Sequence, residues 1–382
     1  MTKGNLAVIG ASYLQLPLIR KAKAMGYKTH VFAWAAGDVG EGEADVFYPI
    51  SIVEKEQILE KCREIGIQGI CTIASDLAAI TVNYVAAHLN LPGNSLEATF
   101  KSTNKHAMRK AFEANGDPSP RSLEVDENTD LQALQLTMPV IVKPTDRSGS
   151  RGITLLSDPK DLNKAVACAM DQGFQKKALI EEFAEGQEYS VEYCSCEGMH
   201  HFLAVTEKFT TGAPHFIETA HLQPARISQD LLAKIQTVVP HALDSLGLTC
   251  GASHSELKID KMGNIKLIEI GGRMGGDCIG SHLVPMTTGV DFVKAVIETA
   301  VGEVPDLQVK KGKTAAIRFI FTGKDLEVLE RLKKEHPQYL VSQDVHAITE
   351  EAVTDSGSRF GYFLMEADSS EDLLSYLPRQ EA

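Results

Sequence analysis

The chain has 382 residues, and at about 100–200 residues per domain this length predicts two or three domains. Hydrophobic residues make up 43% and charged residues 23%, a composition typical of a globular protein that buries its cores without disulfides or structural metals. The net charge of −13 argues against a non-specific binder of nucleic acid or of anionic membranes. It does not exclude a local basic pocket for a small anion.

The chain contains no apolar stretch of the roughly 18 residues that a membrane span requires, and the apolar run at 6–9 is too short for a signal peptide. The seven cysteines are odd in number, and no pair of them has C-x-x-C spacing. We therefore expect free thiols and a cytoplasmic location.

Strand and helix patterns alternate over the first part of the chain. The predicted strands are 5–9, 28–33 and 69–74, and the predicted helices are 17–25, 54–65 and 77–89. This alternation predicts an α/β domain with a parallel sheet, ending near residue 95. Gly10 follows the first strand, but the G-x-G-x-x-G fingerprint is absent, which favours a simple tight turn over a ligand-binding helix N-terminus.

The remainder of the chain mixes strands and helices without strict alternation. A helix at 102–115 is predicted, with Ser102 as its N-cap, and strands with one helix run on to about 185. The predicted elements that follow are strands at 188–196, 200–209, 250–260 and 264–270, a helix at 228–246, and a tail with strand 314–321 and helices 324–335 and 370–377. Residues 261–264 form a good hairpin turn.

Lys143 ends an apolar strand and is followed by a loop rich in glycine and serine. The small residues of this loop are Ser148, Gly149, Ser150 and Gly152. They allow backbone N–H groups to turn toward an anion, and the lysine adds a point charge. The pattern suits the phosphates of a nucleotide, although it is no Walker loop and an ordinary hairpin is the alternative.

A second apolar strand, at 178–180, runs directly into the acids Glu181 and Glu182 and a glycine turn that precedes Glu188. Carboxylates at the end of an apolar strand can bond an adenine amino group or ribose hydroxyls. A solvated turn is the alternative.

The hairpin around 261–264 carries one glutamate inside each apolar strand, Glu256 and Glu269. A charged side chain in such a run is costly unless it is paired or binds a metal, and the hairpin brings these two close together. Two carboxylates can hold an Mg²⁺ that also bridges nucleotide phosphates. Arg273 follows in a glycine-rich loop and can reach a transferring phosphoryl group. Outward-facing strand acids are the alternative.

These three elements, in this order, resemble the ATP-grasp superfamily over about residues 1–305. The resemblance implies an α/β and α+β fold: an N-terminal parallel-sheet α/β domain at 1–95, a linker helix and small lid subdomain at 96–187, and a larger antiparallel-sheet subdomain with the metal site at 188–309. ATP is then held between two antiparallel sheets. The tail at 310–382 looks like the small C-terminal domain of biotin carboxylase-like and purine-pathway members.

The resemblance also implies a role for each matching residue. The implied nucleotide-binding positions are Lys105, Lys143, Ser148, Gly149, Ser150, Gly152, Glu181, Glu182, Phe183, Ala184 and Glu188. Glu256 and Glu269 are the implied Mg²⁺ ligands, with Mn²⁺ as an alternative ion. Arg273, Lys143 and His221 are the implied catalytic residues. Many members carry an asparagine that helps to hold a second Mg²⁺ where this chain has Gly271.

The activity implied by the resemblance is an ATP-dependent carboxylate–amine ligase that forms an amide through an acyl-phosphate and releases ADP and phosphate, similar to stand-alone amino-acid ligases. Its partners are small carboxylate and amine substrates, with neither nucleic acid nor membrane, and a homodimer is the default assembly. One alternative is a formate- or bicarbonate-activating enzyme; another, suggested by Gly271, is a regulatory ATP-binding protein without turnover. Ser12, Ser75, Asp76 and 210–221 are candidates for the substrate pocket.

Overall fold

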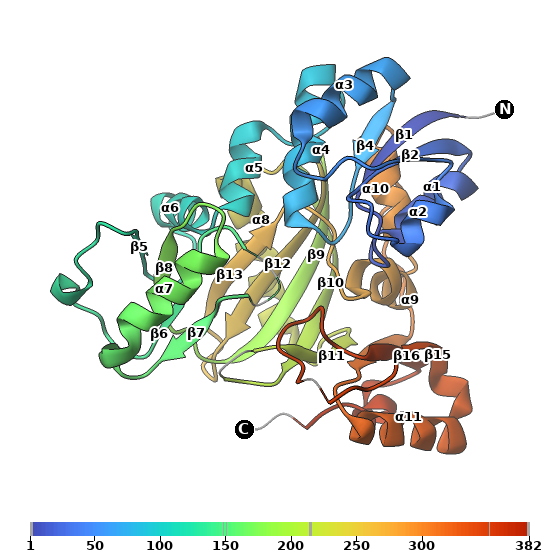
Figure 1. Cartoon of the computed structure of the whole chain (residues 1–382). Coiled ribbons are helices and arrows are strands. Elements are labelled where there is room, and N and C mark those ends of the chain that lie inside the picture. The colour runs from blue at the N-terminus through green and yellow to red at the C-terminus, as the bar shows by residue number, and fades with distance from the viewer. Residues whose placement is uncertain (1–2, 148, 150, 214–215, 351, 380–382) are drawn as a thin grey trace.

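The computed structural model describes residues 3–379 except 148, 150, 214–215 and 351. The N-terminal part is a parallel sheet of four strands in the order β3-β2-β1-β4 (Figure 1). Its strands are β1 (Gly4–Ile9), β2 (Tyr27–Phe32), β3 (Val46–Tyr48) and β4 (Gly69–Cys71), and its helices are α1 (Leu16–Ala24), α2 (Val39–Glu43), α3 (Lys55–Ile65) and α4 (Asp76–Leu89). The predicted parallel α/β domain is confirmed. The short elements α2 and β3 escaped prediction because three to five residues carry no readable period.

The helix predicted at 102–115 is two helices, α5 (Leu96–Thr103) and α6 (Lys105–Asn115). Asn104 lies between them with an extended backbone, and its side chain accepts the Ala107 N–H at 2.9 Å. Asn104 is therefore the N-cap of α6. The prediction of Ser102 as N-cap is wrong: Ser102 lies inside α5, and its hydroxyl donates to the Thr99 carbonyl at 3.1 Å.

The second sheet is antiparallel, with the strand order β5-β8-β6-β7, and we call it the lid sheet. Its strands are β5 (Ser122–Val125), β6 (Val140–Pro144), β7 (Thr154–Leu156) and β8 (Ala178–Glu182). Helix α7 (Leu162–Gln172) packs its apolar side chains, among them Val166, against the inner residues of β6 and β8. This small layer lies apart from the parallel sheet in Figure 1.

The third sheet has eight antiparallel strands in the order β13-β12-β9-β10-β11-β14-β16-β15, and we call it the large sheet. Its strands are β9 (Gln187–Cys196), β10 (Met199–Thr210), β11 (Glu218–Gln223), β12 (Gly251–Ile259), β13 (Ile265–Gly271), β14 (Thr314–Phe319), β15 (Leu340–Val345) and β16 (Gly361–Ala367). Helix α8 (Gln229–Leu246) covers the strands around β9 and β12. The predicted antiparallel sheet and its hairpin are confirmed.

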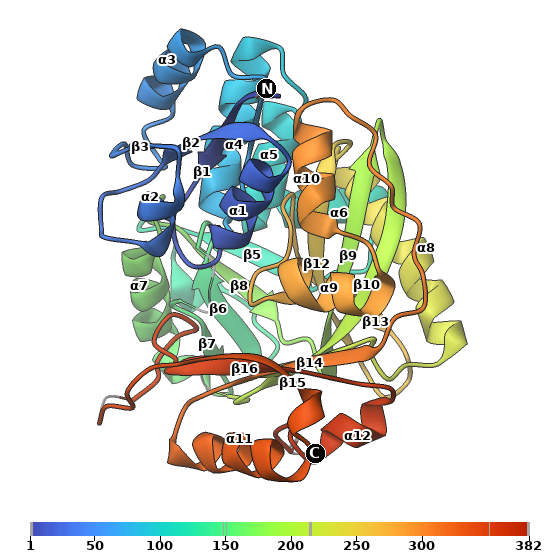
Figure 2. The ribbon, with the colours of Figure 1, turned by 90° about the vertical axis from the view of Figure 1, so that its right-hand side faces the viewer.

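The C-terminal tail continues the large sheet, because β14 pairs with β11 (Figure 2). Helices α11 (Gly323–Glu335) and α12 (Ser370–Leu374) pack against this end of the sheet through a core of their own. Helices α9 (Val284–Thr288) and α10 (Phe292–Ala300) lie between the large sheet and the parallel sheet, and α10 shares a core with α1 and β1. Within the described residues, no helix is both long and apolar enough to cross a membrane.

Candidate active site

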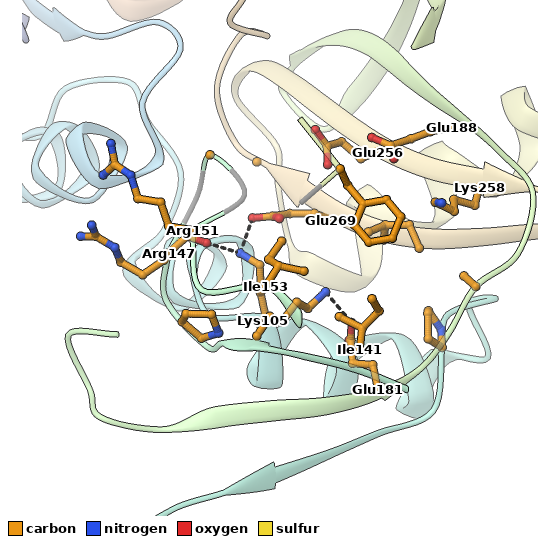
Figure 3. Close-up of a pocket in the computed structure, with 18 of the residues that line it drawn as sticks. Lys105, Ile141, Arg147, Arg151, Ile153, Glu181, Glu188, Glu256, Lys258 and Glu269 are labelled. Atoms are coloured by element: carbon orange, nitrogen blue, oxygen red, sulfur yellow. Dashed lines mark hydrogen bonds and ion pairs between the residues drawn. The ribbon is translucent and has the colours of Figure 1, made fainter. Parts of the chain in front are cut away.

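A pocket lies between the lid sheet and the large sheet, and most of the residues singled out from the sequence line it (Figure 3). The predicted residues that line it are Lys105, Lys143, Gly149, Glu181, Glu182, Phe183, Ala184, Glu188, Glu256, Glu269 and Arg273. Ser148 and Ser150 lie outside the described residues. Gly152 does not line the pocket; a Cβ there would touch Pro144 and Gln172.

The two glutamates of the predicted metal site lie directly opposite each other. Glu256 on β12 and Glu269 on β13 are register partners in the antiparallel ladder, as the hairpin predicts. Lys105 Nζ lies 2.7 Å from Glu269 Oε1 and also donates to the Arg147 carbonyl at 2.7 Å. A lysine from α6 thus ties the loop after β6 to strand β13.

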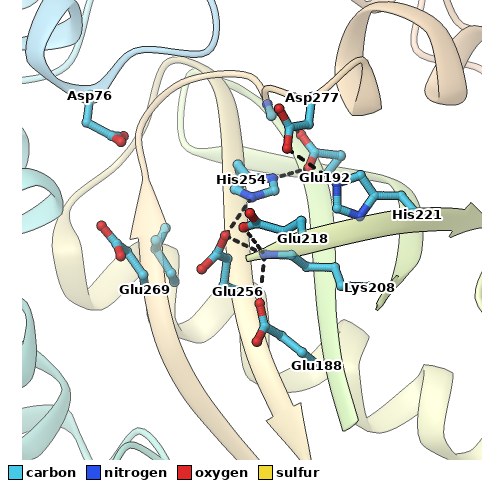
Figure 4. Close-up of polar contacts among 12 residues, drawn as sticks. Asp76, Glu188, Glu192, Lys208, Glu218, His221, His254, Glu256, Glu269 and Asp277 are labelled. Atoms are coloured by element: carbon cyan, nitrogen blue, oxygen red, sulfur yellow. Dashed lines mark hydrogen bonds and ion pairs between the residues drawn. The ribbon is translucent and has the colours of Figure 1, made fainter. Parts of the chain in front are cut away.

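A buried lysine that the sequence analysis missed holds Glu256 (Figure 4). Lys208 Nζ on β10 lies 2.7 Å from Glu188 Oε1, 2.8 Å from Glu256 Oε1 and 3.5 Å from Glu218 Oε1. Burial would lower the pKa of Lys208, but the three carboxylates raise it well above its usual range. The available signal was a lysine in the apolar segment 202–209, the same anomaly that exposed Glu256 and Glu269.

His254 supports Glu256 from the other side. Its Nδ1 contacts the buried Glu192 carboxylate, and its Nε2 lies 3.4 Å from Glu256 Oε1. Burial would lower the pKa of His254, but Glu192 and Glu256 raise it to about 9, so the imidazole is charged at neutral pH. Burial likewise opposes ionisation of Glu256, yet Lys208 and His254 hold its pKa well below the usual range. Lys208 and His254 therefore keep Glu256 in its ionised form.

On the lid sheet, Glu181 pairs with two cations instead of facing open space. It contacts Lys143, and Arg109 Nε lies 2.6 Å from Glu181 Oε1, with all three side chains buried. Burial lowers the pKa of Lys143, although Glu181 opposes this. Arg109 was missed because it lies in α6, far from Glu181 in sequence. The Glu181 carboxylate thus orients Lys143; the predicted contact of this segment with adenine stays a prediction.

Arg273 forms a bidentate ion pair with Asp76, from the first turn of α4. Arg273 Nε lies 2.8 Å from Asp76 Oδ1 and Nη2 lies 2.9 Å from Oδ2. Burial would raise the pKa of Asp76, but Arg273 lowers it. Both side chains line the pocket, so the N-terminal part of the chain contributes a residue to it.

Comparison with known proteins identifies a family domain in this chain. Residues 136–281 match the family model described as an ATP-grasp domain. The chain contains an ATP-grasp domain. The resemblance noted from the three sequence elements is thereby confirmed.

Solved structures extend the likeness beyond the ATP-grasp domain. The L-amino acid ligase from Bacillus licheniformis superposes with a TM-score of 0.83 at 23% identity, over 98% of this chain and 96% of that chain. The N5-carboxyaminoimidazole synthetase from Staphylococcus aureus complexed with ADP gives 0.78 at 18% identity, over 98% and 97%. At these identities the likeness establishes the fold alone.

Among curated proteins, the alanine–anticapsin ligase of Bacillus subtilis (strain 168) is 27% identical over 267 residues, which cover 64% of this chain and 54% of that protein. The chain spans about half the length of the curated relatives it matches first.

His221 lies outside the lining of the ATP-grasp pocket. Its buried ring on β11 meets Phe319 edge-on, with ring centroids 5.6 Å apart, and its Nε2 lies 3.7 Å from Asp277 Oδ2. Asp277 in turn holds Arg359, at 2.6 and 2.9 Å. The structure therefore joins His221 to the loop after Arg273 and to the C-terminal tail, and a catalytic role for it stays a prediction.

A second pocket lies at the carboxyl ends of β1 and β4, where open parallel sheets commonly bind ligands. Its apolar lining comes from Leu14, Leu16, Pro17, Val39 and Ile73. Its polar lining comes from Tyr13, Arg20, Ser281, His282, Asp344 and Tyr362. Ala74 and Cys278 also border it and have φ values of 61° and 63°. Such left-handed backbone in non-glycine residues concentrates at functional sites.

Proposed function

We propose that this protein is an ATP- and Mg²⁺-dependent carboxylate–amine ligase that acts on small substrates through an acyl-phosphate. The observation that carries the proposal is the opposed charge at the two walls of one pocket. On the lid sheet, Lys143 lines the pocket and shares one carboxylate with Arg109 behind it; on the large sheet, three carboxylates line the pocket and share Lys208 behind them. The first arrangement suits phosphates, and the second suits a cation. The ATP-grasp match and the ligase relatives support it.

The residues present fit a divalent cation. Glu256 and Glu269 offer carboxylate oxygens from facing positions, and no group of three or more His, Cys, Asp or Glu side chains is arranged to hold a metal among the described residues. Mg²⁺ commonly takes one or two carboxylates and completes its shell with water and substrate phosphates. When bound, the ion supplies neutralising charge at the phosphates. Lys105 and Lys143 would bind those phosphates, and the 181–184 segment with Glu188 would hold the nucleoside.

The proposed chemistry has two steps. A substrate carboxylate oxygen attacks the γ-phosphorus, the bond from that phosphorus to the bridging oxygen breaks, and ADP leaves with the electron pair. The amine nitrogen then attacks the acyl carbon, the bond from that carbon to the phosphate oxygen breaks, and the amine loses a proton as phosphate leaves. Arg273, which lines the pocket, would stabilise the negative charge that develops in both steps.

The second pocket supports an apolar substrate over a phosphorylated one. Its lining includes the cation Arg20, whose guanidinium Nη2 is paired with Glu43 at 3.1 Å. A phosphate needs cations or several aligned N–H donors, whereas the apolar side chains here would cover an aliphatic or aromatic group. We therefore place an amino acid with an apolar side chain in this pocket.

The test is release of ADP and phosphate by the purified protein with ATP, Mg²⁺ and a panel of amino acids, offered singly and in pairs. The proposal predicts release that requires a carboxylate and an amine, together with a new amide product. Release that depends on bicarbonate or formate alone would instead identify a carboxylate-activating enzyme of another kind. Tight ATP binding without turnover, unchanged by Glu269→Gln, would identify a regulatory protein.

A further inference from the structure

Position 271 has no room for a side chain. A Cβ on Gly271 would lie 2.5 Å from Asp76 Oδ1 and 3.2 Å from Arg273 Nε, and real Cβ atoms essentially never approach another atom within 3.0 Å. The backbone of Gly271 does not have the positive φ that would by itself require glycine. A larger residue here must therefore displace the Asp76 carboxylate, and this occupied space, rather than the backbone conformation, opposes a side chain at 271.

The occupying carboxylate comes from the N-terminal part of the chain. Asp76 is the first residue of α4, directly after the N-cap Ser75, whose hydroxyl accepts the Ala78 N–H at 3.2 Å. The first turn of a helix favours a negative charge. Figure 4 shows Asp76 approaching from a different part of the chain than the strand that carries Glu269.

The loops that carry Asp76 and Arg273 are fastened to each other. The Ala74 N–H donates to the Met274 carbonyl at 3.1 Å, and a Cβ on Gly276 would lie 3.3 Å from Ala74 Cβ. Ala74 adopts this position with a φ of 61°, which is strained for alanine. The contact between the loops is therefore a specific one that fixes where Asp76 points.

The ion pair leaves Arg273 little freedom. Two parallel N–H···O bonds to one carboxylate fix the plane of the guanidinium, and the two side chains are only 14% and 15% exposed. The remaining amino group, Nη1, donates to the Met274 carbonyl at 3.4 Å. Arg273 is thus oriented at the pocket wall before any substrate is present.

We propose that Asp76 is the positioning residue of Arg273 and occupies the place of the side chain that position 271 lacks. This inference rests on the proposed function, which gives Arg273 its role at the transferring phosphoryl group. Gly271, two residues after Glu269, leaves the space in which the Asp76 carboxylate reaches Arg273. The inference concerns the orientation of Arg273 and assigns no metal ligand in place of the asparagine that many ATP-grasp members carry at this position.

A carboxylate at 76 and a side chain at 271 cannot share this space, so substitutions at the two positions must be coupled. Gly271→Asn alone pushes Asp76 away from Arg273 and lowers the melting temperature. In an Asp76→Ala background the atom nearest to the new Cβ is gone and only the Arg273 side chain, with Nε at 3.2 Å, stays close, so adding Gly271→Asn should cost much less. Gly323→Asn is the matched control, because a Cβ there meets nothing within 4 Å. Equal costs of Gly271→Asn in both backgrounds would overturn the inference.

The second measurement is the kcat of Asp76 variants, which tests whether Asp76 positions Arg273. Asp76→Ala should lower kcat by about 100-fold, because a misplaced catalytic group costs about that much, while the Kd for ADP stays unchanged. Asp76→Asn keeps the shape of the side chain and one hydrogen bond to Arg273. Its kcat should therefore lie between those of wild type and Asp76→Ala. Wild-type kcat in Asp76→Ala would refute the positioning role. Absence of turnover in the wild type would refute the proposed function instead, while the melting-temperature cycle still decides the coupling.

Discussion

Two buried lysine clusters on opposite walls of the pocket differ in one respect, the ratio of cations to carboxylates. On the lid sheet, the carboxylate of Glu181 holds both Lys143 and Arg109. On the large sheet, the ammonium of Lys208 holds three carboxylates, those of Glu188, Glu218 and Glu256. The first cluster keeps an excess of positive charge and the second an excess of negative charge.

Under the proposed function, the difference would let one pocket bind a phosphate and a metal at once. Buried ions must be paired, so each cluster contains a counter-ion that keeps its groups charged. Because pairing is incomplete in both, each retains a charge that a ligand can neutralise. The Lys105–Glu269 pair, whose two charges lie 2.7 Å apart, is neutral, so its net charge is intermediate between those of the two clusters.

The most severe test of this comparison is Lys208→Met. The substitution leaves three carboxylates without their shared cation, and removing one partner of a buried ion pair costs about 3–5 kcal/mol of unfolding free energy. Chemical denaturation measures the loss, and added Mg²⁺ should restore stability more in the variant than in wild type. Lys258→Met is the control, because its ammonium lies 5.5 Å from the Phe183 and Phe216 rings and should cost about 1 kcal/mol. Equal losses of unfolding free energy in Lys208→Met and Lys258→Met would contradict the view that Lys208 is the shared counter-ion of three carboxylates.

The second largest effect is expected from Glu256→Gln, because this substitution removes a carboxylate from the proposed metal site. Replacing one carboxylate ligand should weaken Mn²⁺ binding by at least about 100-fold, or about 2.8 kcal/mol, because even partners outside the first ligand sphere cost 10–100-fold. Calorimetric titration with Mn²⁺ and ADP measures this. Glu366→Gln, a strand glutamate paired with Lys313 on the tail, is the control and should bind normally. If Glu256→Gln bound Mn²⁺ with unaltered affinity, the metal would not be held by Glu256.

Glu181→Gln tests the positive cluster. It leaves Lys143 and Arg109 beside each other without a buried carboxylate, and should destabilise the protein by about 1–3 kcal/mol. ADP should raise the melting temperature more in this variant than in wild type, since the freed cations gain a new anion. A smaller ADP shift than in wild type would mean that Glu181 contacts the nucleotide itself.

The smallest effect is expected from Lys266→Ala. Lys266 Nζ lies 3.5 Å from Glu182 Oε2, and both side chains are more than a third exposed. Exposed pairs contribute about 0–1 kcal/mol, so thermal unfolding should hardly change. If Lys266→Ala lost as much stability as Glu181→Gln, burial would not explain the difference between the two ion pairs.

Local sequence patterns predicted much of this molecule. The alternation of apolar segments predicted the parallel sheet, and the turn at 261–264 predicted that Glu256 and Glu269 face each other. Prediction failed where the signal was short or ambiguous. Ser102 was predicted as the helix cap, and only the extended backbone at Asn104 shows that the helix begins two residues later.

The sequence by itself determined most of the strands, the opposed glutamates and the lysine at the end of β6, because these depend on residues close together in the chain. Only the tertiary structure decided how the charges are paired. Asp76 and Arg273 are 197 residues apart, and Lys208 and Glu256 are 48 apart. Each pair forms because a buried charge must find a partner, and the fold, not the local sequence, determines which partner is within reach.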